Sequence, residues 1–297
     1  MRVNPNPMPD LLAALNQTQL EEQQAELQIS TGKSVNEPSD NPAAAALLIE
    51  NNDQATFTNG YLESVSAVQG QLSTASSTLA SITSALQQVI SLGVEAGGGT
   101  LSPSDLAGIA SELQGIQSQI VSLANTAYEG NYIFAGTKTG AAPFVVDASA
   151  PDGSGINYVG NTGVNEVSIG AGYNVAVSQP GSQLFSAPGN DVFLAVTNLI
   201  QAVQTNTGIP AAVNAVSAAN SYLSAQTVFY GNAAGQATSQ TTYLNSAKLQ
   251  IAQQQNTLGG EDMAAAASNL TQAQTDSQAA LAAMGKLSQN NLFDYLT

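Results

Sequence analysis

The chain has 297 residues, of which only 9% are charged, and its 21 acidic residues outnumber 5 basic ones for a net charge of −16 at pH 7. So few cations cannot neutralise a phosphate backbone, and an anionic membrane surface would repel the protein, so we expect neither nucleic acid nor membrane as a partner. Cysteine, histidine and tryptophan are absent. Disulfides, thiolate nucleophiles, imidazole bases and the usual zinc sites are therefore excluded, and we expect no metal and no cofactor.

The chain carries no obvious membrane or secretion segment. No stretch approaches the ~20 apolar residues of a membrane-spanning helix. The first nine residues, Met-Arg-Val-Asn-Pro-Asn-Pro-Met-Pro, lack the apolar core of a secretory signal. If the protein is exported, we expect it to leave without a conventional cleaved signal.

A first helix is predicted from about Pro9 to Gly32, a residue type suited to a left-handed cap. Its apolar side is thin and its middle is crowded with Gln and Glu, so it would be marginal alone in water and needs a partner. The segment Gly32-Lys33-Ser34 resembles part of a phosphate-binding loop. However, the first glycine of that motif would fall at Leu27 and a helix precedes it, so an ordinary loop is favoured over a nucleotide site.

A second, long helix is predicted from Pro42 to about Ala96, with Asn41 as its cap. Asn59-Gly60 alone would signal a hairpin, but its flanks keep helical spacing, so a locally weak helix is favoured. Eight apolar residues in this helix alternate in steps of three and four, which is the seam of a coiled coil. They are Val65, Val68, Leu72, Ala75, Leu79, Ile82, Leu86 and Val89. Such a seam requires partner helices from elsewhere in the chain.

A third helix follows the Gly-rich segment 97–99. Ser102 is placed to cap it and Asp105 lies near its positive end. Its seam runs from Leu106 to Ala127 at helical spacing, and the short connection predicts that it is antiparallel to its predecessor.

Between residues 136 and 189, glycines and prolines separate short runs rich in Val, Ile and aromatic residues. These runs predict the strands of a small antiparallel domain inserted between helices. They are 144–146, 156–159, 164–169 and 173–177.

Helical spacing returns at Val192, breaks near Gly208, and continues as a second long seam from Val216 to Leu258. Three glutamines interrupt this seam at intervals of fourteen residues: Gln226, Gln240 and Gln254. They either fix the register of the pairing or occur by chance in a Gln-rich chain. Gly259-Gly260 then ends the seam, and a last helix starts at Glu261-Asp262.

The predicted fold class is mainly α: an elongated antiparallel helical coiled-coil bundle formed by both chain ends, with a small inserted antiparallel β-rich outer domain. The predicted domains are a terminal helical assembly domain (1–42 and 258–297), a helical bundle domain (43–135 and 190–257) and the β-rich outer domain (136–189).

Several of these segments resemble the bacterial flagellin superfamily. The run from Ile29 to Ala43 is similar to its N-terminal signature, and Asn131-Tyr132-Ile133-Phe134-Ala135-Gly136-Thr137 is similar to its motif at the entry to the outer domain. Glu261-Asp262-Met263 and the final Asn-Leu-Phe-Asp-Tyr-Leu fit its C-terminal region. That ending resembles the branch found at the hook–filament junction more than filament flagellin. The proline-rich start departs from the family pattern.

The resemblance implies a structural, extracellular component of the bacterial flagellum, exported through the flagellar type III apparatus. The implied partners are hook-associated protein 1, flagellin, copies of itself in a ring and a flagellar export chaperone. A flagellin that forms the filament itself is the alternative. An enzyme is a third class, for which no nucleophile–base constellation is visible.

The two chain ends carry the functional hypothesis. The first and last helices each have one thin apolar side, so the entropy of ordering them is not offset in an isolated monomer. Paired with each other and with neighbouring subunits, they could bury a set of large apolar residues. These are Leu11, Leu15, Leu27, Ile29, Leu270, Leu281, Met284, Leu287, Leu292 and Phe293. Assembly would then be coupled to folding of the ends.

Overall fold

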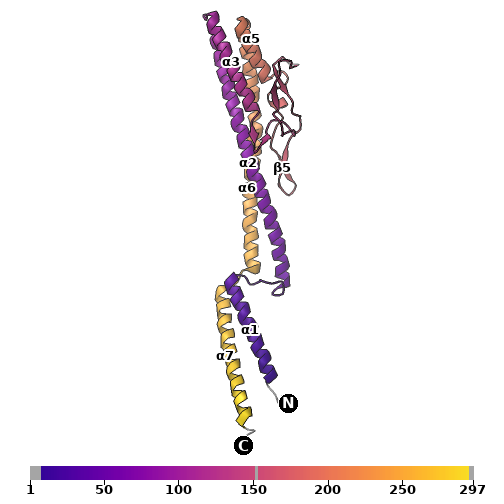
Figure 1. Cartoon of the computed structure of the whole chain (residues 1–297), viewed down its shortest axis with the longest axis vertical. Helices are drawn as coiled ribbons and strands as arrows, with labels where there is room; N and C mark the ends of the chain where they lie inside the picture. The colour runs from indigo at the N-terminus through magenta and orange to yellow at the C-terminus, as the bar shows by residue number, and fades with distance from the viewer. Residues whose placement is uncertain (1–7, 151–152, 294–297) are drawn as a thin grey trace. The chain divides into compact units, whose positions relative to one another are not determined.

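The computed structural model of the chain describes residues 8–150 and 153–293 (Figure 1). The helices in these ranges are α1 (Met8–Thr31), α2 (Pro42–Ala96), α3 (Pro103–Ala124), α4 (Gly181–Leu184), α5 (Val192–Thr205), α6 (Ile209–Gly259) and α7 (Met263–Phe293). The strands are β1 (Ala127–Tyr128), β2 (Asn131–Tyr132), β3 (Phe144–Val146), β4 (Ile156–Tyr158), β5 (Glu166–Gly170) and β6 (Tyr173–Ala176). The predicted mainly helical fold with small antiparallel β elements is confirmed.

The chain divides into two compact units. The terminal unit comprises the residues up to Phe57 together with those from Ala247 onward, and the central unit comprises Thr58–Ser246. Helices α2 and α6 contribute to both units. The predicted boundaries at 42 and 258 lie at helix ends, whereas the compact units divide within the two long helices.

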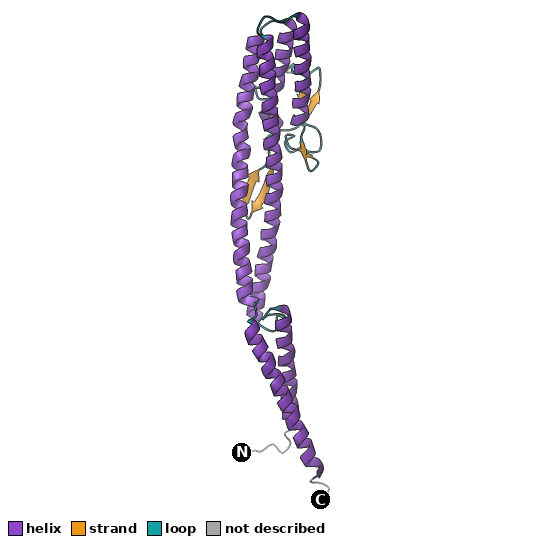
Figure 2. Cartoon of the chain, turned by 90° about the vertical axis from the view of Figure 1, so that its left-hand side faces the viewer, coloured by secondary structure: helices purple, strands orange, loops and turns teal. Residues whose placement is uncertain are grey.

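In the terminal unit, α1 and α7 lie side by side and run in opposite directions (Figures 1 and 2). Gly32 ends α1 with φ of +68°, the left-handed conformation that the sequence predicted for it. Asp262 caps α7, because its Oδ1 accepts hydrogen bonds from the amide N–H groups of Ala264 (2.9 Å) and Ala265 (3.2 Å). The end of α1 and the start of α7 are thus set by local sequence.

Helix α2 has the predicted bounds and continues through Asn59-Gly60. The amide N–H of Ala44 donates to Asn41 Oδ1 (3.1 Å), which confirms Asn41 as its cap. In the central unit every residue of the Val65–Val89 seam is buried, none being more than 1% exposed. The seam packs in one apolar cluster with residues of α3, α5 and α6.

The other helices of the central unit follow the sequence signals with one difference. Ser102 and Asp105 form a capping box at the start of α3, and Asp191 Oδ1 accepts from the Leu194 N–H (2.8 Å) at the start of α5. The seam predicted for α3 reached Ala127, which is wrong at its end. The helix stops at Ala124, where Asn125 caps it, and Ala127 begins β1 instead.

The strands form three separate two-stranded antiparallel hairpins, β1–β2, β3–β4 and β5–β6 (Figure 2). The last four strands match the predicted runs to within about two residues, whereas the first hairpin was not predicted. Four phenylalanines pack against one another, with ring centroids 5.0–6.2 Å apart. They come from the segment after β2, from β3, from the residue after α4 and from α5. They are Phe134, Phe144, Phe185 and Phe193. The hairpins therefore share the apolar core of the helices.

The three glutamines of the second seam differ in how far they are buried. Gln226 and Gln240 are half-buried on α6, and the Gln240 amide lies against Gly170 of the β5–β6 hairpin. Gln254 is exposed. Within the described ranges, none of the helices has both the length and the apolar character to cross a membrane.

Candidate assembly site

The fully buried residues in the contact between α1 and α7 are small. The buried side chains there are Ala25, Ala266 and Ala273, each no more than 4% exposed. Alanine allows two helices to approach closely but removes little apolar surface from water, whereas full burial of one leucine contributes roughly 1.5–3 kcal/mol. The helix pair therefore has close geometry and a weak apolar core.

The predicted assembly residues fall into three groups. Leu11, Leu15, Ile29, Leu270 and Met284 are half-buried. Leu27 and Leu281 are exposed, at 44% and 53%. The side chains of Leu287, Leu292 and Phe293 lie outside the described residues. Leu11 precedes the buried Ala25 by fourteen residues, and Leu15 precedes Ile29 by the same interval, so these residues share one side of α1.

The predicted assembly residues did not include the three buried alanines, although Ala266 and Ala273 follow the apolar spacing that the sequence shows in the last helix. Ala266 and Ala273 are seven residues apart, which is the spacing of a coiled-coil seam. The signal is faint because the surrounding segment is itself rich in alanine, so a seam of alanines has no contrast with its flanks.

Polar side chains surround this contact. A cavity of about 390 Å³ lies between the two helices, lined by Glu21, Gln24, Ala25, Gln28, Asn269, Gln272, Ala273 and Asp276. Its two carboxylates are held by their own helices: Gln17 Nε2 donates to Glu21 Oε1 (3.0 Å) and Gln272 Nε2 donates to Asp276 Oδ1 (2.9 Å). No charge pair crosses between α1 and α7 here, so the cavity adds little to their affinity.

The terminal unit also exposes many large apolar side chains. On α1, Leu12, Leu20 and Leu27 fall within an arc of about 80°, roughly opposite to Ala25 and Ile29. We call these three leucines the outer stripe. The other exposed large apolar residues of this unit are Leu47, Ile49, Phe57, Leu249, Met263 and Leu281. A concentration of exposed apolar side chains is typical of surfaces that contact other proteins.

The loop after α1 pairs with the link between α6 and α7. The Ser34 N–H donates to the Gly259 carbonyl (2.9 Å), and the Glu261 N–H donates to the Gly32 carbonyl (3.1 Å). Residues 33 and 260 form an antiparallel bridge between them. A Cβ on Gly259 would lie 3.0 Å from Leu48 Cδ1, so a larger residue here would displace the Leu48 side chain.

Asp40 stabilises the far end of the same loop. Its Oδ2 accepts hydrogen bonds from the amide N–H groups of Asn36 and Glu37, both at 2.9 Å. The bond from Glu37 and then that from Asn36 lower the pKa of the Asp40 carboxyl below its usual range. The loop from 33 to 40 is thus fixed at both ends.

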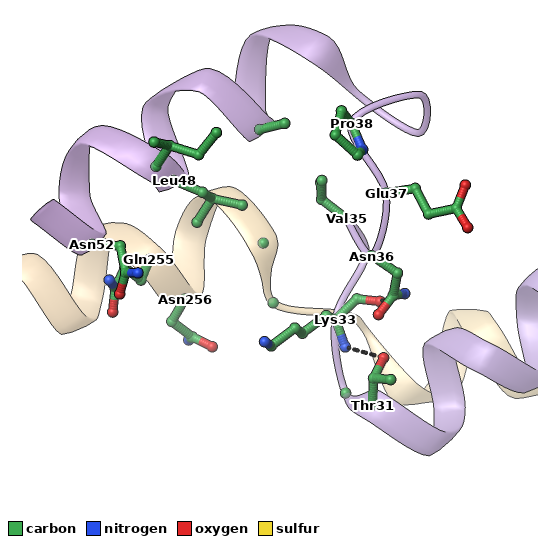
Figure 3. Close-up of a pocket in the computed structure, with 15 residues that line it drawn as sticks. Thr31, Lys33, Val35, Asn36, Glu37, Pro38, Leu48, Asn52, Gln255 and Asn256 are labelled. Carbon is green, nitrogen blue, oxygen red and sulfur yellow. Dashed lines mark hydrogen bonds between the residues drawn. The ribbon is translucent and has the colours of Figure 1, made fainter.

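A pocket of about 630 Å³ opens beside this loop (Figure 3). Its lining is mainly carboxamides, glycines and apolar side chains, with Lys33 and Glu37 as the charged residues. In Figure 3 the Lys33 side chain extends toward Asn256, whereas Glu37 points away from it. A nucleotide site was not expected at Gly32-Lys33-Ser34, and here these residues form part of the loop that pairs with the α6–α7 link.

Among the described residues, no group of three or more carboxylates is placed to hold a metal ion. Tyr230 is the most perturbed titratable group, and its pKa is raised because its hydroxyl is buried, although the Gln179 N–H donates to it. It packs in the core of the central unit, which explains the shift without a catalytic role.

Comparison with known proteins identifies the class. The family description "Bacterial flagellin N-terminal helical region" matches residues 7–139, and "Bacterial flagellin C-terminal helical region" matches residues 207–296. Together the two matches span more than half of the chain, which therefore belongs to the bacterial flagellin family. This is a family of structural flagellar proteins and not of enzymes. The resemblance inferred from the sequence motifs is confirmed.

Two curated relatives within this family share the name of one flagellar protein. The chain is 42% identical over 118 residues to "Flagellar hook-associated protein 3" of Salmonella typhimurium, which covers 39% of this chain and 37% of the relative. It is 33% identical over 159 residues to the protein of the same name from Escherichia coli, which covers 53% and 48%. The matched segments thus span less than half the length of these curated relatives.

Solved structures share the fold. A putative flagellar hook-associated protein from Vibrio parahaemolyticus has a TM-score of 0.67 at 20% identity, covering 73% of this chain and 98% of that one. The flagellar junction protein FlgL from Legionella pneumophila has a TM-score of 0.60 at 14% identity, covering 72% and 100%. At these identities the likeness is one of fold.

Proposed function

We propose that the protein is a structural adaptor at the junction between hook-associated protein 1 and the flagellin filament, where copies of it form a ring. Its terminal helices complete their folding as the ring assembles. The names of the two curated relatives support the position in the flagellum. The contrast between the two units supports the mechanism, and it is the observation that carries the proposal.

We expect the central unit to fold without contacts from neighbouring subunits. Its core contains fully buried leucines, isoleucines and phenylalanines drawn from four long helices and the hairpins. In the terminal unit the α1–α7 contact buries alanines and leaves the outer stripe exposed. Ordering the backbone takes about 1–2 kcal/mol per residue, so a 24-residue helix such as α1 needs more apolar burial than this contact supplies.

Neighbouring subunits would provide the missing burial. Covering the exposed leucines of one copy by another adds the apolar area that stabilises both terminal helices. The isolated monomer then lacks a stable assembly surface, which prevents polymerisation before the protein reaches the flagellum. We propose that terminal helices of low stability suit passage through the flagellar type III apparatus, and that an export chaperone covers the C-terminal region until then.

The alternative is a filament flagellin, with which the two matching family descriptions agree equally well. The two roles differ in what the purified protein does. A filament flagellin polymerises into long filaments when seeded, whereas a junction adaptor stops at short rings or remains monomeric.

Removal of residues 288–297 tests the adaptor role. In a strain that lacks the protein, we expect the truncated chain to leave hooks without filaments, while the purified variant keeps the circular dichroism and thermal unfolding of a folded central unit. The full-length chain, expressed at the same level, is the control and restores filaments. Filaments of normal number with the truncated chain, or long homopolymers of the purified full-length chain, would overturn the proposal.

A further inference from the structure

The pocket beside the 33–40 loop includes the side chain of Lys33. No ion pair involves the Lys33 amine within the part of the chain that the structure describes. This is notable in a protein with 21 acidic and 5 basic residues. Around Lys33 the pocket presents the carboxamides of Asn52, Gln255 and Asn256. A carboxylate on an apolar surface would complement such a pocket in charge and hydrogen bonding.

The floor of the pocket is apolar. Val35 and Leu48 are half-buried, and Ile49 lines the pocket while 63% exposed. An isoleucine left so open in a recess is available for contact with an apolar side chain from another molecule. The pocket therefore combines an apolar floor with a single available cation.

The outer stripe of α1 has the complementary features. Leu20 and Leu27 are 60% and 44% exposed and lie within about 20° of each other around the helix. Glu26 precedes Leu27 and is exposed about 100° from it around the helix, at the side of the outer stripe, and the described residues contain no hydrogen-bond or ion-pair partner for its side chain. One copy thus carries an apolar pocket with a cation and, on α1, an apolar stripe with an anion at its side, and this stripe ends at Leu27, one helical turn before the pocket residue Thr31.

We propose that the pocket of one copy receives the outer stripe of a second copy, with Leu27 of the second copy against Ile49 and its Glu26 beside Lys33. The two surfaces differ, so the contact is head-to-tail and repeats from copy to copy, closing a ring when the rotation permits. Apolar burial supplies most of the affinity, and the ion pair sets the orientation. This contact rests on the proposed function, because it is one way for copies to form a ring.

Disulfide trapping tests the contact directly, because the chain has no cysteine of its own. Ile49→Cys and Leu27→Cys are prepared as separate full-length proteins, mixed at high concentration and oxidised. Each chain then has one thiol, so a heterodimer reports a contact between copies. Oxidation accumulates the product even when the contact is transient. Leu249→Cys replaces Ile49→Cys in the control, since Leu249 is similarly exposed (66%) in the same unit but lies outside the pocket.

We expect the Ile49–Leu27 mixture to yield at least about fivefold more heterodimer than the Leu249–Leu27 control, and more than the homodimer of either variant alone. Equal yields with the control, or no product, would overturn the contact. Homodimers of the Ile49→Cys protein as the main product would also overturn it, because they indicate a symmetric contact between two pockets. All three substituted residues are exposed, so unchanged circular dichroism is expected.

The role of Lys33 is tested by removing its charge. Adding Lys33→Gln to the Ile49→Cys protein should lower the heterodimer yield about threefold at low salt and remove its dependence on ionic strength. Lys248→Gln makes the same change in net charge outside the pocket and should leave the yield unchanged. An equal effect of both substitutions would contradict the role of Lys33. These measurements need no filament, so they can fail while the truncation result for the adaptor role holds, and the reverse.

Discussion

At the scale of single residues, Asn125 shows how the small β elements are protected from further pairing. Its side chain sits at the free edge of β3, where Oδ1 accepts from the Phe144 N–H (2.9 Å) and Nδ2 donates to the Phe144 carbonyl (2.8 Å). One carboxamide thus occupies both backbone groups that a further strand would bind. Two-stranded sheets expose two edges, and a covered edge does not template association.

Asn125→Ala should therefore be strongly destabilising. It leaves the N–H and carbonyl of the buried Phe144 without partners, and we expect the free energy of unfolding to fall by about 2–4 kcal/mol. Urea denaturation of the full chain measures this. The control is Asn131→Ala, since Asn131 is exposed and its Oδ1 accepts one bond at 3.2 Å from Thr139 Oγ1. Equal losses for both variants would show that the edge contact is unimportant.

A second prediction at this scale concerns the seam of α2. Leu79 is fully buried in the core of the central unit. Leu79→Asp places a charge there without a partner and should lower the free energy of unfolding by about 3–5 kcal/mol. Ala80→Asp adds the same charge at the next, exposed position and should change it by less than about 0.5 kcal/mol. A loss below about 1 kcal/mol for Leu79→Asp would contradict the packing of this seam.

At the scale of elements, the capping box of α3 links a local motif to pH. The Ser102 hydroxyl donates to Asp105 Oδ2 (2.7 Å), and the Ser102 N–H donates to the same oxygen (3.1 Å). These bonds favour the ionised form and lower the pKa of Asp105. Because the folded-state pKa is the lower one, the carboxylate stabilises the helix start at pH above its unfolded pKa. That contribution is lost as pH falls through the folded pKa.

An NMR titration of the Asp105 carboxyl checks this. We expect its midpoint below the ordinary value of 3.8, and we expect Ser102→Ala to move the midpoint upward, since the hydroxyl is the largest cause of the shift. An unchanged midpoint in Ser102→Ala would contradict the assignment of the shift to this bond.

The elements differ in how far the sequence predicts them. The α2 seam was predictable because large apolar residues recur at steps of three and four among polar neighbours. The N-terminal caps of α2 and α3 were predictable from Asn41 and Ser102. The pairing of the first and last helices was predicted as well, but the alanines buried between them were not, because they do not stand out from an alanine-rich helix. The β1–β2 hairpin was missed because its turn places Glu129 at φ of +48°, a conformation that glutamate rarely adopts.

The same limit applies to the candidate site. Sequence reasoning indicated that the chain ends carry assembly, and it named leucines by their size. Which side of α1 meets α7 depends on the buried Ala25, so the half-buried Leu11 and the exposed Leu27 could not be separated without the structure. The pocket at Lys33 depends on pairing between residues far apart in the chain, which no local pattern predicts.

At the scale of the whole molecule, the two units have opposite characters. The central unit buries large apolar side chains, whereas in the terminal unit the fully buried residues between α1 and α7 are alanines and the leucines of the outer stripe face outward. A difference of this kind separates a region that folds alone from one that is completed by neighbours. The proposed coupling of assembly to folding depends on this difference in local stability.

Hydrogen exchange of the backbone amides in the purified monomer tests this claim most directly. We expect residues 65–89 to exchange only through global unfolding, while residues 11–31 and 263–286 exchange orders of magnitude faster and gain protection when the protein is incorporated into flagella. If both ends of the isolated monomer were as protected as residues 65–89, folding of the ends would not be coupled to assembly and the account would be contradicted.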